Sequence, residues 1–85
     1  MVTTFGKETD PALRIRRAQG KLIRQTRQMR GLSIDDFAKA VDKTPGAVSQ
    51  WELGNYTPRP AVQVKIAEVL NVPWSLIFGL DREVA

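Results

Sequence analysis

The stretch from Leu32 to Pro60, L-S-I-D-D-F-A-K-A-V-D-K-T-P-G-A-V-S-Q-W-E-L-G-N-Y-T-P-R-P, has the pattern of two short helices joined by a tight turn. Ser33 and Thr44 favour helix N-caps, Pro45 suits a first helical position, and Gly54 suits a helix end. Only two residues separate the predicted helices, so we expect the helices to cross steeply rather than to lie antiparallel. The stretch therefore predicts a helix-turn-helix, a motif that is typical of DNA-binding proteins.

Apolar residues at helical spacing predict which side of each helix faces the core. These residues are Phe37, Ala38 and Val41 in the first helix, and Val48, Trp51 and Leu53 in the second.

A longer helix is predicted before this pair, opening at Asp10 and Pro11 and ending at Gly31. Gly20 is either tolerated inside this helix, at a cost of about 1 kcal/mol against Ala, or it separates an outer basic piece from the helix proper. Two apolar stripes are compatible with the sequence: Leu13, Ala18, Leu22, Thr26 and Met29, or Ile15, Leu22, Ile23 and Thr26.

Two more helices are predicted after the pair. Pro60 begins one that runs through Leu70, with its apolar side formed by Val62, Ile66, Ala67, Val69 and Leu70. Trp74 to Phe78 forms a last short helix, with Pro73 at its start and Gly79 past its end. We divide the chain into an arm and basic helical extension (1–19), a helix-turn-helix domain (20–80) and a tail (81–85).

Composition bounds the class of protein. The chain has 85 residues with no Cys and no His, so disulfides, thiolate metal sites and His-based catalysis are not expected. We expect no cofactor, no metal, no small-molecule ligand and no enzymatic activity. The sequence has no signal-peptide pattern and no apolar run near 18 residues, so we expect no membrane association and a cytoplasmic location at the nucleoid, in a bacterial or phage-encoded protein.

The formal net charge is +4, which favours an anionic partner. The charge is uneven: residues 1–30 contain eight Lys or Arg and two acidic residues, whereas the remainder contains five and seven. This asymmetry is typical either of a phosphate-contacting face or of an ordinary solvated surface.

Five separated blocks then resemble one known family. They are I-R-x-x-R-x-x-x-G-L-S from Ile23, F-A at Phe37, V-S-Q-W-E-x-G from Val48, Pro58, and K-I-A-x-x-L-x-V-P from Lys65. Together they are similar to the phage repressor and Cro (lambda-repressor-like, XRE) family of helix-turn-helix domains. The resemblance implies an all-α, compact bundle of four to five short helices that binds DNA sequence-specifically, usually as a dimer, with its third helix in the major groove.

The outward positions of that third helix are the candidate base contacts: Gly46, Ala47, Ser49 and Gln50. The Gln50 amide suits a bidentate contact with adenine, Ala47 offers only a contact to a thymine methyl, and Gly46 admits close backbone approach. Pro45 and Gly46 stand where many family members have polar base readers, so we expect DNA shape to contribute to specificity.

Candidate phosphate contacts flank the recognition helix or lie on the first helix. The resemblance places some of them where the family touches the DNA backbone, and the basic first helix supplies the rest: Lys43, Thr44, Asn55, Tyr56, Arg59, Arg24, Arg14, Arg16 and Arg17. Ile34 replaces a frequent phosphate-contacting Gln, so it is expected only to pack. The resemblance also implies an ion pair between Arg27 and Glu52 that fixes the angle between their helices.

The C-terminal residues are unusually apolar for so short a helix. Trp74, Leu76, Phe78 and Leu80 form a possible dimer surface or, as an equal alternative, cover the core.

The predicted function is that of a transcriptional regulator occupying a double-stranded DNA operator as a homodimer, led by a phage or prophage repressor or a Cro-like protein. The alternatives are the N-terminal domain of a longer repressor, an antitoxin that represses its own operon and binds a protein partner, and a protein-interaction module that does not bind DNA. A partner-binding version of the fold would present an apolar third helix.

Overall fold

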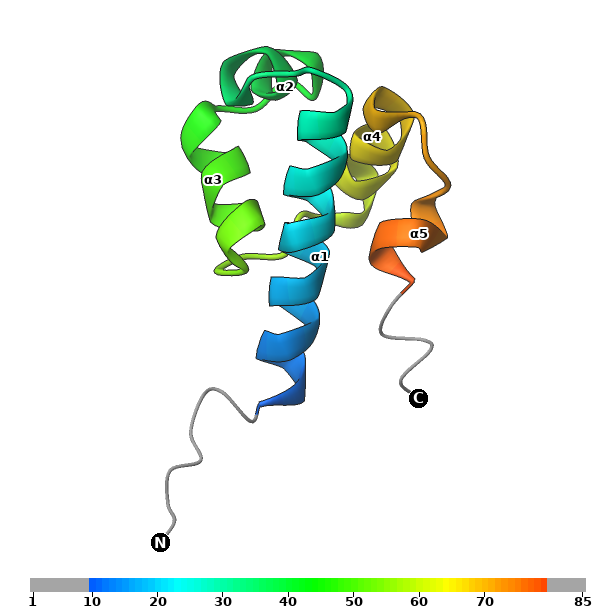
Figure 1. Cartoon of the computed structure of the whole chain (residues 1–85). Helices are drawn as coiled ribbons and strands as arrows, with labels where there is room; N and C mark the ends of the chain where they lie inside the picture. Colours follow the sequence, from blue (N-terminus) through cyan, green and yellow to red (C-terminus); the bar gives the residue numbers. More distant parts are fainter. Residues whose placement is uncertain (1–9, 80–85) are drawn as a thin grey trace, which may run out of the picture.

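The structure is a computed structural model that describes residues 10–79, and within that range it contains five helices and no strands. They are α1 (Pro11–Met29), α2 (Ile34–Ala40), α3 (Pro45–Leu53), α4 (Pro60–Leu70) and α5 (Trp74–Phe78). Figure 1 shows α1 upright at the centre, with α2 and α3 on one side and α4 and α5 on the other. The predicted all-α bundle with its helix-turn-helix is confirmed. The predicted arm before Asp10, the last domain residue Leu80 and the predicted tail (81–85) lie outside the described residues.

The helix ends follow from local chemistry. The Asp10 side chain accepts a hydrogen bond from the Ala12 N–H at the start of α1, at 3.0 Å. Ser33 and Thr44 do the same for Asp36 and Ala47, at 3.0 and 3.1 Å. Each of these side chains provides a partner for a backbone donor that the first helical turn leaves unpaired. The predicted bounds of α3, α4 and α5 are confirmed, and α2 ends at Ala40, one residue earlier than predicted.

A continuous α1 decides between the two alternatives for Gly20. The helix runs through this residue without interruption, and Gly20 lies against the C-terminal end of α3. A Cβ built at Gly20 would lie 2.4 Å from the carbonyl oxygen of Trp51 and 2.5 Å from that of Glu52. The glycine therefore permits a close approach of the α1 and α3 backbones.

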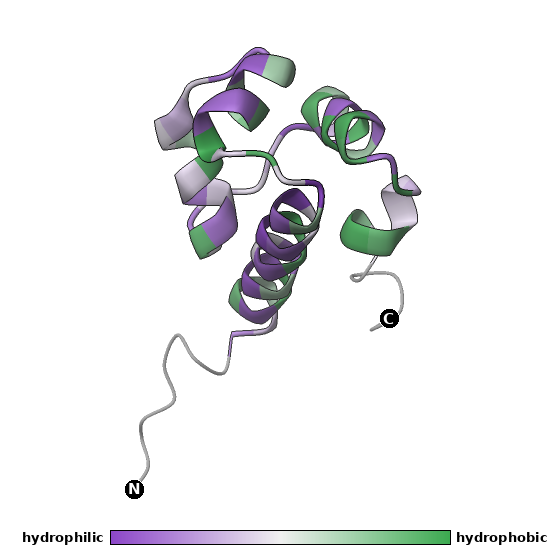
Figure 2. Ribbon diagram, turned by 45° about the horizontal axis from the view of Figure 1, so that its top comes forward, coloured by the Kyte–Doolittle hydropathy of each residue, from purple (hydrophilic) through white to green (hydrophobic). Residues whose placement is uncertain are grey.

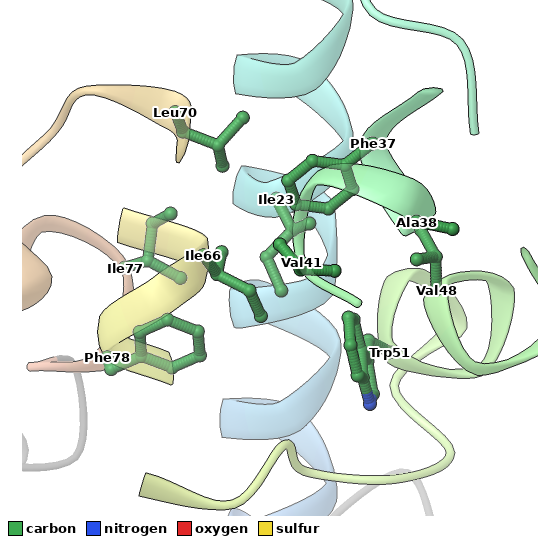
Figure 3. Close-up of a cluster of buried hydrophobic side chains, with 10 residues drawn as sticks. All are labelled: Ile23, Phe37, Ala38, Val41, Val48, Trp51, Ile66, Leu70, Ile77 and Phe78. Atoms are coloured by element: carbon green, nitrogen blue, oxygen red, sulfur yellow. The ribbon is translucent and has the colours of Figure 1, made fainter. Parts of the chain in front are cut away.

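The core lies where all five helices meet. Figure 3 shows its ten side chains converging from every helix: Ile23, Phe37, Ala38, Val41, Val48, Trp51, Ile66, Leu70, Ile77 and Phe78. Helix α1 packs on α3 and α5, α2 packs on α3, and α4 packs on α5. Figure 2 shows the hydrophobic colour over α5 and much of α4, whereas the hydrophilic colour recurs along α1.

Three apolar residues predicted to face inward are exposed. Met29 is 80% exposed and Leu53 is 62% exposed, and Ala18 is also exposed. Met29 and Leu53 are the last residues of their helices, where no neighbouring element covers them. The inward side of α1 follows the second predicted stripe more closely, and beyond that stripe it also includes the polar Gln19 and Arg27.

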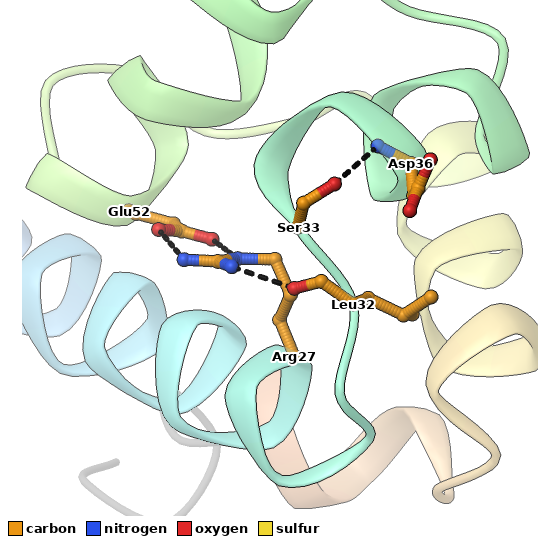
Figure 4. Close-up of polar contacts among 5 residues, drawn as sticks. All are labelled: Arg27, Leu32, Ser33, Asp36 and Glu52. Carbon is orange, nitrogen blue, oxygen red and sulfur yellow. Dashed lines mark hydrogen bonds and ion pairs between the residues drawn. The ribbon is translucent and has the colours of Figure 1, made fainter.

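Arg27 and Glu52 join α1 to α3 through a two-pronged ion pair (Figure 4). Nε of Arg27 donates to Oε2 of Glu52 at 2.7 Å, and Nη2 donates to Oε1 at 3.2 Å. Nη1 donates to the carbonyl oxygen of Leu32 at 2.8 Å. The two side chains are only 8% and 7% exposed. The guanidinium therefore links α1, α3 and the segment that leads into α2.

A second arginine holds α4 in place. Nε of Arg30, at the end of α1, donates to the carbonyl oxygen of Leu70 at 2.8 Å. Nη2 donates to that of Asn71 at 3.3 Å. Carbonyl groups at a helix C-terminus carry partial negative charge and lack helical partners, so a cation is favourable there.

Substitution of Gly20 by Ala should lower the free energy of unfolding, measured by urea denaturation. Ala is the better helix former by about 1 kcal/mol. Its Cβ, however, needs space that the α3 backbone occupies, and overpacking typically costs about 1–3 kcal/mol. The control is Gly46→Ala, where an added Cβ would have its nearest contact at 3.9 Å and a small stabilisation is expected. A Gly20→Ala protein as stable as the wild type would contradict the close approach.

Substitution of Glu52 by Ala should cost about 3 kcal/mol of unfolding free energy, because it leaves the Arg27 charge nearly buried without its partner. The exposed Glu68→Ala variant, which removes the same charge from α4, should change stability by less than about 0.5 kcal/mol. The double variant Arg27→Met with Glu52→Leu should be more stable than Glu52→Ala. Equal stability of the Glu52→Ala and Glu68→Ala proteins would show that the pair does not hold α1 to α3.

Candidate nucleic-acid interface

The N-terminal half of α3 forms an accessible surface on a fixed support. Val48 and Trp51 are buried in the core, so they fix the rotation of α3 about its axis. Gly46 is exposed, while Ser49 and Gln50 are half-buried. A Cβ at Gly46 would meet only the Thr44 hydroxyl, at 3.9 Å, so the helix backbone can be approached closely here.

Ala47 differs from its predicted outward position. It is half-buried and packs against the core cluster. Part of its methyl surface is therefore covered by the core and is not accessible to DNA. Ile34, expected only to pack, is also partly buried against the same cluster.

Ser49 lies beside α1 rather than alone on the surface of α3. It lines a hollow of about 220 Å³ between α1, α2 and α3. The other lining residues are Arg24, Arg27, Ile34, Glu52 and Leu53. The hollow brings one predicted base contact and one predicted phosphate contact, Ser49 and Arg24, to the same place.

The predicted phosphate contacts lie at both ends of α3. Lys43 and Thr44 are exposed at its N-terminal end, and Asn55, Tyr56 and Arg59 are exposed in the loop that follows its C-terminal end. Because the Thr44 oxygen accepts the Ala47 N–H, its own hydroxyl proton remains able to donate.

Four exposed cations form a line along α1. We define the basic stripe as Arg14, Arg17, Lys21 and Arg24, all of which are exposed. Their spacing of three, four and three residues places them on one side of a helix. Lys21 was not among the predicted contacts, although its helical spacing from the neighbouring arginines is visible in the sequence. In Figure 1 the first turns of α1 extend below the other helices.

Arg16 has a partner inside the protein. It is half-buried, and its Nε donates to the carbonyl oxygen of Gly54 at 3.1 Å. Gly54 itself has φ +81° and lies so close to α1 that a Cβ would be 2.8 Å from the Cα of Arg17. Arg16 thus ties the loop after α3 to α1, a contact that the sequence pattern did not indicate.

The predicted dimer surface is only partly exposed. Leu76 is 51% exposed, but Phe78 is 2% exposed, so of the two alternatives for Phe78 the core position is confirmed and the external surface is wrong. Trp74 is half-buried, and its ring nitrogen donates to Oε1 of Gln63 at 3.0 Å. Leu80 lies outside the described residues. Val64 of α4 is 49% exposed and lines, with Trp74, a groove of about 370 Å³.

None of the helices described between residues 10 and 79 is both long and apolar enough to cross a membrane.

Comparison with solved structures finds the same fold in bacterial regulators. The clp gene regulator ClgR from Corynebacterium glutamicum is 22% identical, with a TM-score of 0.71 over 74% of this chain and 67% of that one. An HTH_3 family transcriptional regulator from Vibrio cholerae is 26% identical, with a TM-score of 0.72 over 86% of this chain. The match spans only 41% of the Vibrio protein. No curated protein gives a significant match.

A family comparison identifies the helix-turn-helix directly. The family HTH_3, described as helix-turn-helix, matches residues 23–77. This range contains all of α2, α3 and α4 and most of α1 and α5. A helix-turn-helix is a motif that presents a recognition helix to DNA. The chain therefore belongs to the HTH_3 family of helix-turn-helix, DNA-binding domains.

Proposed function

We propose that this protein is a sequence-specific transcriptional regulator, of the phage or prophage repressor or Cro-like type, that occupies an operator by placing α3 in the major groove. The observation that carries the proposal is the accessible N-terminal half of α3, supported from behind by the buried Val48 and Trp51. Such a role would place the protein at the nucleoid, in the cytoplasm. The regulators from Corynebacterium and Vibrio share the fold, which is consistent with this function.

Direct base contact is assigned to Gln50 and Ser49, with Gly46 admitting the helix backbone to the groove. Amide and hydroxyl groups match the donors and acceptors on the major-groove edges of base pairs. Because Ala47 packs against the core, only the exposed part of its methyl group is available to contact a base. Because only two polar side chains are available, DNA shape supplies part of the specificity.

Phosphate contact is assigned to the two ends of α3 and to the basic stripe. At the ends of α3 the contacting residues are Lys43, Thr44, Asn55, Tyr56 and Arg59. Since Arg24, the last residue of the basic stripe, lines the same hollow as Ser49, the stripe continues the cationic surface away from α3 along α1. This arrangement suits the DNA backbone, whose charge is repeated at regular intervals. Because Nε of Arg16 is bonded to the Gly54 carbonyl oxygen, Arg16 is assigned to phosphate contact only through the remaining N–H groups of its guanidinium.

A homodimer on a two-fold operator is the proposed assembly. Among the described residues of α4 and α5, Val64 and Leu76 are the exposed large apolar side chains, and each is about half exposed. This side is separated from α3 by α1 (Figure 1), so two copies meeting there would leave both recognition helices accessible. Two-fold pairing predicts half-sites about one helical turn apart.

The two alternative functions make different demands on α3. A protein-interaction module would use an apolar outer face, whereas Gly46, Ser49 and Gln50 present backbone, hydroxyl and amide groups. The observed surface therefore favours DNA. An antitoxin that represses its own operon would use the same α3 surface and would add a protein partner elsewhere on the molecule.

Selection of bound sequences from a random pool of duplex DNA should yield one motif with two related half-sites. With that motif in hand, Gln50→Ala should weaken binding to it by about tenfold or more, because a base contact is worth about 1–3 kcal/mol. Binding to random DNA should change little. The matched control is Gln25→Ala, an exposed glutamine on α1, which should affect neither. Equal losses on selected and random DNA would refute base reading by Gln50.

Salt dependence tests the basic stripe. The double variant Arg14→Gln with Arg17→Gln should reduce the slope of log affinity against log salt by about 0.9 per lost phosphate contact, or about 2 in all. The control is Lys39→Gln with Lys65→Gln, which removes the same charge from exposed positions on α2 and α4. If both double variants change the slope equally, net charge rather than the stripe is responsible.

A further inference from the structure

The C-terminal end of α3 holds one candidate base contact in a defined orientation. Nδ2 of Asn55 donates to Oε1 of Gln50 at 2.7 Å. The backbone N–H of Asn55 also donates to the carbonyl oxygen of Gln50, at 3.0 Å. Asn55 is therefore attached to Gln50 through both its main chain and its side chain.

The backbone beneath this pair is itself fixed. Gly54 takes a left-handed conformation with φ +81°, and its N–H donates to the carbonyl oxygen of Trp51 at 3.0 Å. Its own carbonyl oxygen accepts from Nε of Arg16 at 3.1 Å. Because Trp51 is in the core and Arg16 is on α1, the position of Asn55 is set by groups outside the DNA-facing surface.

An amide side chain has two chemically different edges. Its oxygen only accepts hydrogen bonds, and its nitrogen only donates them. Since Asn55 donates to the oxygen of Gln50, one of the two lone pairs of that oxygen is occupied, whereas both N–H donors of the Gln50 NH₂ group remain available. An amide held in this way offers donors to a base and loses little rotational freedom when it binds.

We propose that Asn55 is a positioning residue that sets the amide orientation of Gln50 and thereby selects bases presenting acceptors in the major groove. Those acceptors are purine N7, guanine O6 and thymine O4. The inference rests on the proposed function, and it deepens that function by naming the chemistry read at one base pair. It also extends one expectation from the sequence: Asn55 acts on the base through Gln50 as well as on phosphate.

Asn55→Asp provides a direct test. A carboxylate has no N–H to donate, so it can bond only to the NH₂ group of Gln50. The Gln50 amide then turns by half a rotation and presents its oxygen outward. In selections from a random duplex pool, preference at the contacted position should move by about tenfold from guanine, which presents only acceptors in the major groove, toward cytosine, which presents only a donor.

Two controls separate this effect from the added negative charge. Thr57→Asp places the same charge at an exposed position in the same loop, and it should weaken all sequences alike without changing the preferred base. Asn55→Asp combined with Gln50→Ala should show the same base preference as Gln50→Ala alone. Asn55→Ala, which removes the bond without adding charge, should relax the preference because both amide orientations become accessible.

The outcomes are distinguishable. A changed preference in Asn55→Asp that disappears in the double variant supports the inference. An unchanged preference in Asn55→Asp and Asn55→Ala, with binding retained, overturns it and leaves the proposed function intact. Failure of the unsubstituted protein to select any sequence overturns the proposed function, and this inference with it.

Discussion

The close contact between α1 and α3 is the constraint on which the rest of this structure depends. At Gly20 the two helices are so near that a single Cβ would collide with the α3 carbonyl groups. The nearly buried ion pair of Arg27 and Glu52 joins the helices on one side of Gly20. The hydrogen bond from Arg16 to Gly54 joins α1 to the end of α3 on the other side. A nearly buried ion pair gives little net stability but strongly disfavours arrangements that separate its partners. The contact therefore fixes where α3 lies more than it adds to stability.

This rigidity matters for reading DNA. Hydrogen bonds to base edges need side chains placed to within fractions of an ångström, and a short helix on a small domain achieves that only when its support does not move. Trp51 and Val48 hold α3 from the core side, while Arg27 and Arg16 hold its C-terminal end and the loop beyond. The Gln50–Asn55 pair lies on top of this support. The physical basis of the proposed function is thus a polar α3 surface that is held in place by the rigid contact between α1 and α3.

The basic first helix serves two separate purposes. Arg16, Arg27 and Arg30 turn toward the protein and hold the loop after α3, α3 itself and the end of α4. The basic stripe remains exposed on another side of the same helix. Composition alone reports both groups as positive charge, although only the second is fully available to an anionic partner. An arginine's partner depends on which side of the helix it occupies and on what the fold brings to that side.

The sequence by itself determined the helices and the motif, because caps such as Ser33 and Thr44, helix-starting Pro45 and Pro60, and left-handed Gly54 act through bonds within a few residues. Its apolar spacing also indicated Phe37, Val48 and Ile66 as core. It placed Leu53 incorrectly and left Met29 and Phe78 undecided between two alternatives, since the exposure of a residue near a helix end depends on which other element covers it. Only the tertiary structure decided that Gly20 admits α3, that Arg16 binds Gly54, and that Asn55 orients Gln50, because each is a contact whose existence depends on the packing of distant helices or on the path of the chain after α3.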